Sequence, residues 1–261
     1  MKSVRRGAGT ATMIALAFAL PLSGQSLLRL APPEGQVNLY VYSMEMSMQN
    51  PMMPISMTLR AHQTQTILSA TDEVIRARTA IDSSTMTVST PGGPPAPDLS
   101  GRAFTIEMDP RGRMLNVAAD DAAGDDVEAV AEALLEGSNF FWLPEAEVAA
   151  GDSWTDIVPV PLSMGSMGGP AATMEVEFTY TFTSLEDGQA TITFTGPVES
   201  SLDMGGMPVS VSGELSGSLV VDVGEGRYVR QESRLSVEMG MGGMAMPVET
   251  TTTLELVTDP T

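Results

Sequence analysis

The sequence contains no cysteine, one histidine (His62) and one lysine (Lys2) among its 261 residues. Without cysteine we expect no disulfide framework, no thiolate chemistry and no thiol that carries a lipoprotein anchor. Basic side chains are also scarce, because 13 lysines and arginines stand against 33 aspartates and glutamates, a formal net charge of −20. A field this negative disfavours nucleic acid and anionic membrane surfaces as partners.

Motifs that would support an enzyme are missing as well. One histidine without cysteine provides no zinc ligand set, and no Gly-x-Ser-x-Gly elbow presents a serine nucleophile. The glycine pairs lack the lysine and the following helix of a phosphate-binding loop. Asp120, Asp121, Asp125 and Asp126 lack the spacing of an EF-hand and are better explained as charges at a helix start. We therefore expect no enzymatic activity, no catalytic residue and no cofactor, and we expect His62 to be an exposed strand residue.

The first 26 residues have the features of a signal peptide. A basic start containing Arg5 and Arg6 precedes an apolar run over residues 10–22, and the small residues Gly24 and Ser26 follow. The apolar run is too short to span a bilayer as a helix. We expect cleavage after Ser26, within a few residues, and a mature chain of residues 27–261 in the periplasm or outside the cell, without a lipid anchor.

Alternation of apolar and polar residues dominates the mature chain. Between residues 174 and 183 the apolar side chains share one face of a predicted strand, and glutamates and threonines share the other. Other strands are predicted over residues 37–48, 55–69, 74–89, 102–108, 113–117, 190–194, 209–223, 228–239 and 248–256. Gly213 and Gly217 lie on the apolar face of one of them, where a missing side chain permits a bend or a close approach. Glu186-Asp187-Gly188 is typical of a hairpin turn.

One segment has helical periodicity, and we expect a helix over about 125–136 that ends before Gly137. A long antiparallel sheet has to curl, close or split into two layers to protect its edges. Long strands in up-and-down order favour an open barrel over a sandwich. The sequence therefore predicts one all-β domain, a strongly curved antiparallel sheet of ten or eleven strands with a single helix against its concave side.

Several turns and strand ends resemble those of an uncharacterised family of exported bacterial proteins. The residues that carry this resemblance are Leu143-Pro144, Gly151-Asp152-Ser153-Trp154, Phe104-Thr105-Ile106, Asp109-Pro110-Arg111-Gly112-Arg113, and Asp222 with Gly226-Arg227. That family is similar in architecture to the LolA/LolB and LppX-type envelope carriers, half-barrels with a helix over the concave face. The resemblance implies lipid-like cargo in an apolar groove and implies no catalytic residues. The chain differs from many family members by lacking the lipoprotein cysteine.

Methionine is in excess, with 20 residues against four tyrosines. Three interpretations stay open: core packing, a groove that adapts to varied apolar cargo, and a soft site for Cu(I) or Ag(I). The metal alternative would use the closely spaced Met44, Met46, Met48, Met239, Met241 and Met244.

These patterns favour non-catalytic binding of an apolar or amphiphilic, lipid-like small molecule in a groove between sheet and helix. The candidate lining residues are Tyr40, Tyr42, Met44, Met46, Leu134, Phe141, Phe178, Tyr180 and Phe182. The aromatic run at 140–142 either packs the helix exit onto the sheet or forms the mouth of the groove. A structural envelope protein with a filled core and no ligand is the third class of function.

Overall fold

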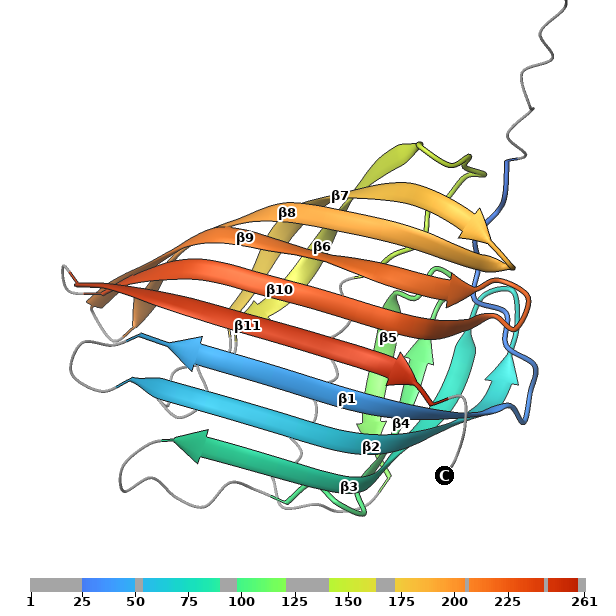
Figure 1. Cartoon of the computed structure of the whole chain (residues 1–261), viewed down its shortest axis with the longest axis horizontal. Helices are drawn as coiled ribbons and strands as arrows, with labels where there is room; N and C mark the ends of the chain where they lie inside the picture. Colours follow the sequence, from blue (N-terminus) through green and yellow to red (C-terminus); the bar gives the residue numbers. More distant parts are fainter. Residues whose placement is uncertain are drawn as a thin grey trace, which may run out of the picture.

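The computed structural model describes residues 25–49, 54–89, 98–120, 141–162, 172–204, 207–241 and 244–257. Eleven strands in these segments form one sheet in the order β5-β4-β3-β2-β1-β11-β10-β9-β8-β7-β6 (Figure 1). The strands are β1 (Val37–Met48), β2 (Ile55–Ala70), β3 (Ile75–Ser89), β4 (Ala103–Met108), β5 (Met114–Ala119), β6 (Ser153–Leu162), β7 (Ala172–Glu186), β8 (Gln189–Met204), β9 (Met207–Asp222), β10 (Arg227–Met241) and β11 (Met244–Leu256). The predicted all-β chain with an open antiparallel sheet is confirmed. The helix predicted at about 125–136 lies outside the described residues.

The strand order is that of an up-and-down barrel opened at one place. Every strand pairs with its neighbour in the chain except at β5 and β6, and β1 pairs with β11. All the pairings are antiparallel. The two open edges therefore belong to β5 and β6, which in Figure 1 lie behind the long strands. The curved sheet thus has one continuous inner face, and the apolar residues of the alternating strands point towards it.

β6 is absent from the strands predicted above. Its sequence contains Pro159 and Pro161, which cannot donate a ladder hydrogen bond. β6 is an edge strand that pairs with β7 alone, and proline is tolerated at such an edge. Val158 and Val160 still alternate inwards and are 1% and 4% exposed.

The half of the barrel around β7 and β8 is filled by side chains. Phe178, Tyr180 and Phe182 are at most 2% exposed and belong to the larger of two apolar clusters. Phe141 meets Phe194 edge to face, with ring centroids 4.7 Å apart, and Phe178 meets Phe194 in the same way at 5.5 Å. The aromatic residues predicted from β7 to line a groove are therefore packed against one another here.

Two local predictions are confirmed. Asp187 and Gly188 both have positive φ, 50° and 80°, in the tight turn between β7 and β8. A Cβ atom on Gly217 would overlap the carbonyl oxygen of Glu232 and the ring of Phe194, so this glycine allows a close approach.

Candidate functional site

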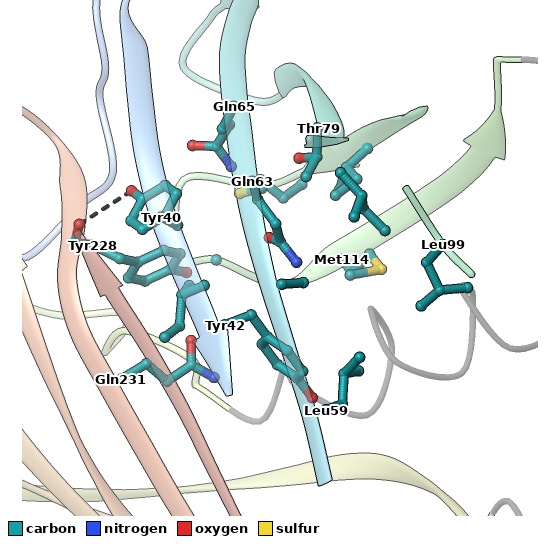
Figure 2. A pocket seen from close by; sticks show the side chains of 16 residues that line it. Tyr40, Tyr42, Leu59, Gln63, Gln65, Thr79, Leu99, Met114, Tyr228 and Gln231 are labelled. Atoms are coloured by element: carbon teal, nitrogen blue, oxygen red, sulfur yellow. Dashed lines mark hydrogen bonds between the residues drawn. The ribbon is translucent and has the colours of Figure 1, made fainter. Parts of the chain in front are cut away.

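The other half of the barrel contains a cavity of about 100 Å³ (Figure 2). Its lining comprises Tyr40, Tyr42, Leu59, Ala61, Gln63, Gln65, Thr79, Ile81, Leu99, Ile106, Met108, Gly112, Met114, Tyr228, Gln231 and Leu254. An engineered apolar cavity of about 150 Å³ accommodates benzene, so this space suits a small molecule or one end of a longer one.

Strand register explains how these side chains meet. On β1 and β2, Tyr40 lies opposite Gln63 and Tyr42 lies opposite Ala61, and opposite residues of an antiparallel pair share one face. Figure 2 shows side chains from three strands around the same space: Tyr40 and Tyr42 from β1, Gln63 and Gln65 from β2, and Tyr228 and Gln231 from β10. The smaller apolar cluster, which contains Tyr42, Leu59 and Ala61, forms the apolar part of the wall.

The tyrosine hydroxyl groups of the cavity are neutral donors. Tyr40 Oη donates to the carbonyl oxygen of Tyr228 at 3.1 Å. Burial raises the pKa of Tyr42 to about 12, opposed by a hydrogen bond with Thr252. Burial also raises the pKa of Tyr40, and the positive charge of Arg227 opposes that rise. Arg227 is therefore close enough to act electrostatically on the cavity wall.

A row of polar side chains crosses the inner face beside the cavity. Asn38 is 1% exposed, and its Oδ1 accepts from Gln36 Nε2 at 3.0 Å and from Arg227 Nη1 at 3.3 Å. Asn38 Nδ2 donates to Gln65 Oε1 at 3.3 Å. Gln65 lies opposite Thr79 on β3, so the row continues to that residue.

Three buried polar atoms of this region have no hydrogen-bond partner among the described residues: Thr79 Oγ1, Arg227 Nε and Gln36 Oε1. Thr79 is 4% exposed and lines the cavity. A buried polar group without a partner costs about 1–3 kcal/mol, so a cluster of three is unusual in a purely structural core.

A second, water-sized space of about 20 Å³ lies next to the first. Arg227 and Asn38 line it, and Gln65, Met108 and Tyr228 line both spaces. The polar row thus lies along both spaces, and Asn38, Gln65 and Arg227 are the polar side chains of a small recess whose other walls are mostly apolar.

The structure brings only some of the predicted groove residues to the cavity. Tyr40 and Tyr42 line it, while Met44 and Met46 continue the same face of β1 as half-buried residues. Phe141, like the β7 aromatics, is packed in the larger cluster, and Leu134 lies outside the described residues. His62 is exposed on β2, as predicted.

Sequence reasoning missed the polar half of the site. It assigned inner positions to apolar residues, whereas Gln63, Gln65 and Thr79 occupy inner positions of β2 and β3. A signal was present, because Gln63 and Gln65 continue the parity of Leu59 and Ala61 along one strand. Both glutamine side chains are half-buried, and amides at inner-face positions of a strand are informative in this way.

The methionines form cross-strand pairs at the other end of the inner face. Met46 lies opposite Met57, and Met239 lies opposite Met246. Met46 and Met48 pack against the larger apolar cluster, Met239 is 7% exposed and Met244 is 50% exposed. The side chain of Met241 is outside the described part. Among the described residues, no group of three or more His, Cys, Asp or Glu is placed to hold a metal ion.

Residues 128–227 match a family of unknown function (DUF6263). No curated protein matches the sequence. A solved structure of lipovitellin, described as showing lipid–protein interactions, is similar to 86% of this chain with a TM-score of 0.52 and 11% identity. This chain spans about a quarter of that protein, 25% of its length, and the likeness concerns the fold alone. The described segments contain no helix with the length and hydropathy needed to span a bilayer.

Proposed function

We propose that this chain is an exported, non-catalytic protein that binds a small apolar or amphiphilic ligand inside its open barrel. The observation that carries the proposal is the cavity itself, apolar along Tyr42, Leu59 and Leu99 and polar along Gln65 and Thr79. A mostly apolar concavity with a few convergent polar groups is the usual form of a small-molecule site.

Three further observations support the proposal. Lipovitellin, the protein of similar fold, is described by its lipid–protein interactions. The resemblance of the Leu143-Pro144 and Gly151-Asp152-Ser153-Trp154 segments to exported proteins similar in architecture to the LolA/LolB and LppX-type carriers supports the proposal. The basic start and apolar run of the first 26 residues support export to the periplasm or the medium.

The size of the cavity sharpens the proposal. A volume of about 100 Å³ is below that of the engineered cavity of about 150 Å³ that holds benzene. The described residues therefore enclose one end of an amphiphile rather than a complete membrane lipid.

The alternative function is the binding of Cu(I) or Ag(I) by methionine side chains. The pairing of the strands supports this alternative. Met46 with Met57 and Met239 with Met246 are directly opposed pairs, each offering two thioether sulfur atoms. Thioethers favour Cu(I) among the biologically available metals. The same pairs also pack apolar surface, which is the more general role of methionine in cores.

The test of the cavity is a substitution that fills it. Ala61→Phe introduces a ring into the cavity, because Ala61 is 2% exposed and lines it. His62→Phe is the matched control, since the same ring is added to the exposed neighbour on β2. Binding is followed with the uncharged probe N-phenyl-1-naphthylamine, and co-purified molecules are sought by native mass spectrometry without detergent exchange.

We expect the wild type and His62→Phe to bind the probe and Ala61→Phe to lose binding while remaining folded by circular dichroism. A wild type that neither binds the probe nor carries a co-purified molecule contradicts the proposal. Equal binding by folded Ala61→Phe contradicts the assignment to this cavity.

A further inference from the structure

The polar row on the inner face is continuous across four strands. Asn38 lies opposite Gln65, and Gln65 lies opposite Thr79. β11 lies between β1 and β10 and pairs with both, but it ends at Leu256, opposite Tyr40. Beyond that point no strand of the described part separates β1 from β10, so Arg227, the first residue of β10, donates a hydrogen bond directly to Asn38 on β1. Because β11 ends there, the guanidinium group of Arg227 becomes part of the row of polar side chains.

Arg227 forms no ion pair within the described part of the chain, although Asp222 lies opposite it on β9. Its Nη1 donates to the neutral amide of Asn38, and its buried Nε has no acceptor there. This is notable in a protein with 33 acidic residues. A cation partly removed from water without a partner carries a desolvation cost that an anion would offset.

The unpaired groups also have the right polarity for an anion. Arg227 Nε–H and the hydroxyl of Thr79 are both donors without an acceptor among the described residues. A water molecule could accept a hydrogen bond from either group, but it would not neutralise the positive charge of Arg227. Gln36 Oε1, the third unpaired atom, is an acceptor and is left for water.

The recess beside Arg227 limits the size of the anion. Its volume of about 20 Å³ is little more than the 10–15 Å³ or so that one water needs. The recess accommodates a carboxylate group better than a bulky phosphodiester head. It shares Gln65, Met108 and Tyr228 with the main cavity, so a chain attached to that carboxylate continues along the apolar wall.

We propose that the ligand is a carboxylate-headed amphiphile whose head is bound by Arg227, Asn38 and Gln65 at the recess and whose chain enters the apolar part of the main cavity, which Thr79 also lines. This inference rests on the proposed function and adds the class of ligand and its orientation. Arginine recognises carboxylates through paired, charge-assisted hydrogen bonds, which supports its role as the anchor.

The experiment compares two probes of equal chain length, dodecanoate and dodecanol, by isothermal titration. The variants are Arg227→Gln and the control Arg234→Gln, the same change at an exposed arginine of β10 that pairs with Glu249 on the outside. We expect the wild type to bind dodecanoate more tightly than dodecanol. Arg227→Gln should weaken dodecanoate by roughly tenfold or more and leave dodecanol within about twofold, because a hydrogen bond to a charged group contributes that much.

Gln65→Leu is the second variant, for the case in which Arg227→Gln does not fold. It removes the amide that lines both spaces and accepts from Asn38, and it should weaken dodecanoate by about threefold to tenfold. If dodecanol binds as tightly as dodecanoate, or if the folded variants bind dodecanoate as the wild type does, the head-group assignment is overturned and the cavity proposal stands. If neither probe binds the wild type, while N-phenyl-1-naphthylamine does, the ligand class is wrong. If no probe binds at all, the proposed function fails with it.

Discussion

Arg111 donates from Nη2 to Oδ2 of Asp156 at 2.6 Å, across the two open edges of the sheet. Arg111 lies in the turn between β4 and β5, and Asp156 lies on β6. Arg111 Nε also donates to the carbonyl oxygen of Leu143 at 2.6 Å. The barrel is thus open in its strand pairing but held at one end by a guanidinium group.

The first prediction concerns this bridge. Arg111→Met leaves Asp156 partly buried without its partner, and we expect the free energy of unfolding to fall by about 3 kcal/mol near pH 7. The side chains of Arg111 and Asp156 are 13% and 21% exposed, whereas that of Arg113, in its pair with Asp109, is 48% exposed. Arg113→Met is therefore the control, with a loss of about 1 kcal/mol or less in urea unfolding.

The same pair predicts a pH dependence. Burial raises the pKa of Asp156, and the charge of Arg111 opposes that rise. Removing the guanidinium takes the folded pKa still further above the unfolded value. A raised carboxyl pKa contributes stability that is present below the unfolded pKa and is lost as the pH rises through the folded one. The penalty of Arg111→Met should therefore be smaller near pH 4 than near pH 7, and a penalty that grows on acidification would contradict the assignment.

The second prediction concerns Gly217. Because a Cβ atom there meets the backbone of Glu232 and the ring of Phe194, Gly217→Ala should lower the free energy of unfolding by about 2–3 kcal/mol. Gly224→Ala is the matched control, since its Cβ meets only Asp222 Oδ1 at 3.4 Å. Equal losses of stability for Gly217→Ala and Gly224→Ala in thermal or urea unfolding would show that the close contact of Gly217 with Glu232 and Phe194 does not cause the destabilisation.

The third prediction concerns the effect of the Thr79 hydroxyl on stability. In the ligand-free protein Thr79→Val removes a buried hydroxyl without a partner, so we expect the free energy of unfolding to rise by about 1 kcal/mol. Thr87→Val, at an exposed position of the same strand, should change it little. A loss of stability on Thr79→Val would mean that the hydroxyl is satisfied in the native state.

The fourth prediction tests the methionines. Met46→Leu with Met57→Leu conserves volume at a directly opposed pair and should change stability by less than about 1.5 kcal/mol. An anaerobic Cu(I) titration against a strong competitor should show the same weak retention for both proteins. Stoichiometric Cu(I) on the wild type that disappears in the double variant would favour the soft-metal alternative.

The fifth prediction concerns the mature N-terminus. We expect export with cleavage after Ser26, so that the intact mass of the secreted protein corresponds to a chain beginning at Leu27. Ser26 exchanges two backbone hydrogen bonds with Val148, at 2.9 and 3.0 Å, and these would be lost. A mass corresponding to a start at Gln25 would move the site upstream and preserve the bridge, and an uncleaved mass would contradict export.

Much of the sheet could be predicted from local patterns. Alternation predicted the strands over 37–48 and 75–89 within a residue or two, because a half-buried strand has to show it. Tyr40 and Tyr42 were correctly placed on an inner face for the same reason. β6 was missed, since the two prolines are acceptable only at an edge and edge position is a property of the whole sheet.

The candidate site was predictable only in its apolar half. Nothing in local patterning shows that Arg227 reaches Asn38, 189 residues away, because that contact depends on where β11 ends. The packing of Phe178 in the core likewise depends on tertiary contacts, because Phe178 and Phe141, 37 residues apart, both meet the ring of Phe194.

The sequence by itself determined the class of fold, since residues that alternate between apolar and polar in long runs bury their apolar faces as strands. Only the tertiary structure decided which part of the inner face is filled and which is hollow. It also decided that one cation and several amides meet at the hollow part. The physical reason is that the curvature of the sheet and the order of its strands bring together residues that are far apart in the chain. A short stretch of sequence contains no information about which distant residues will meet.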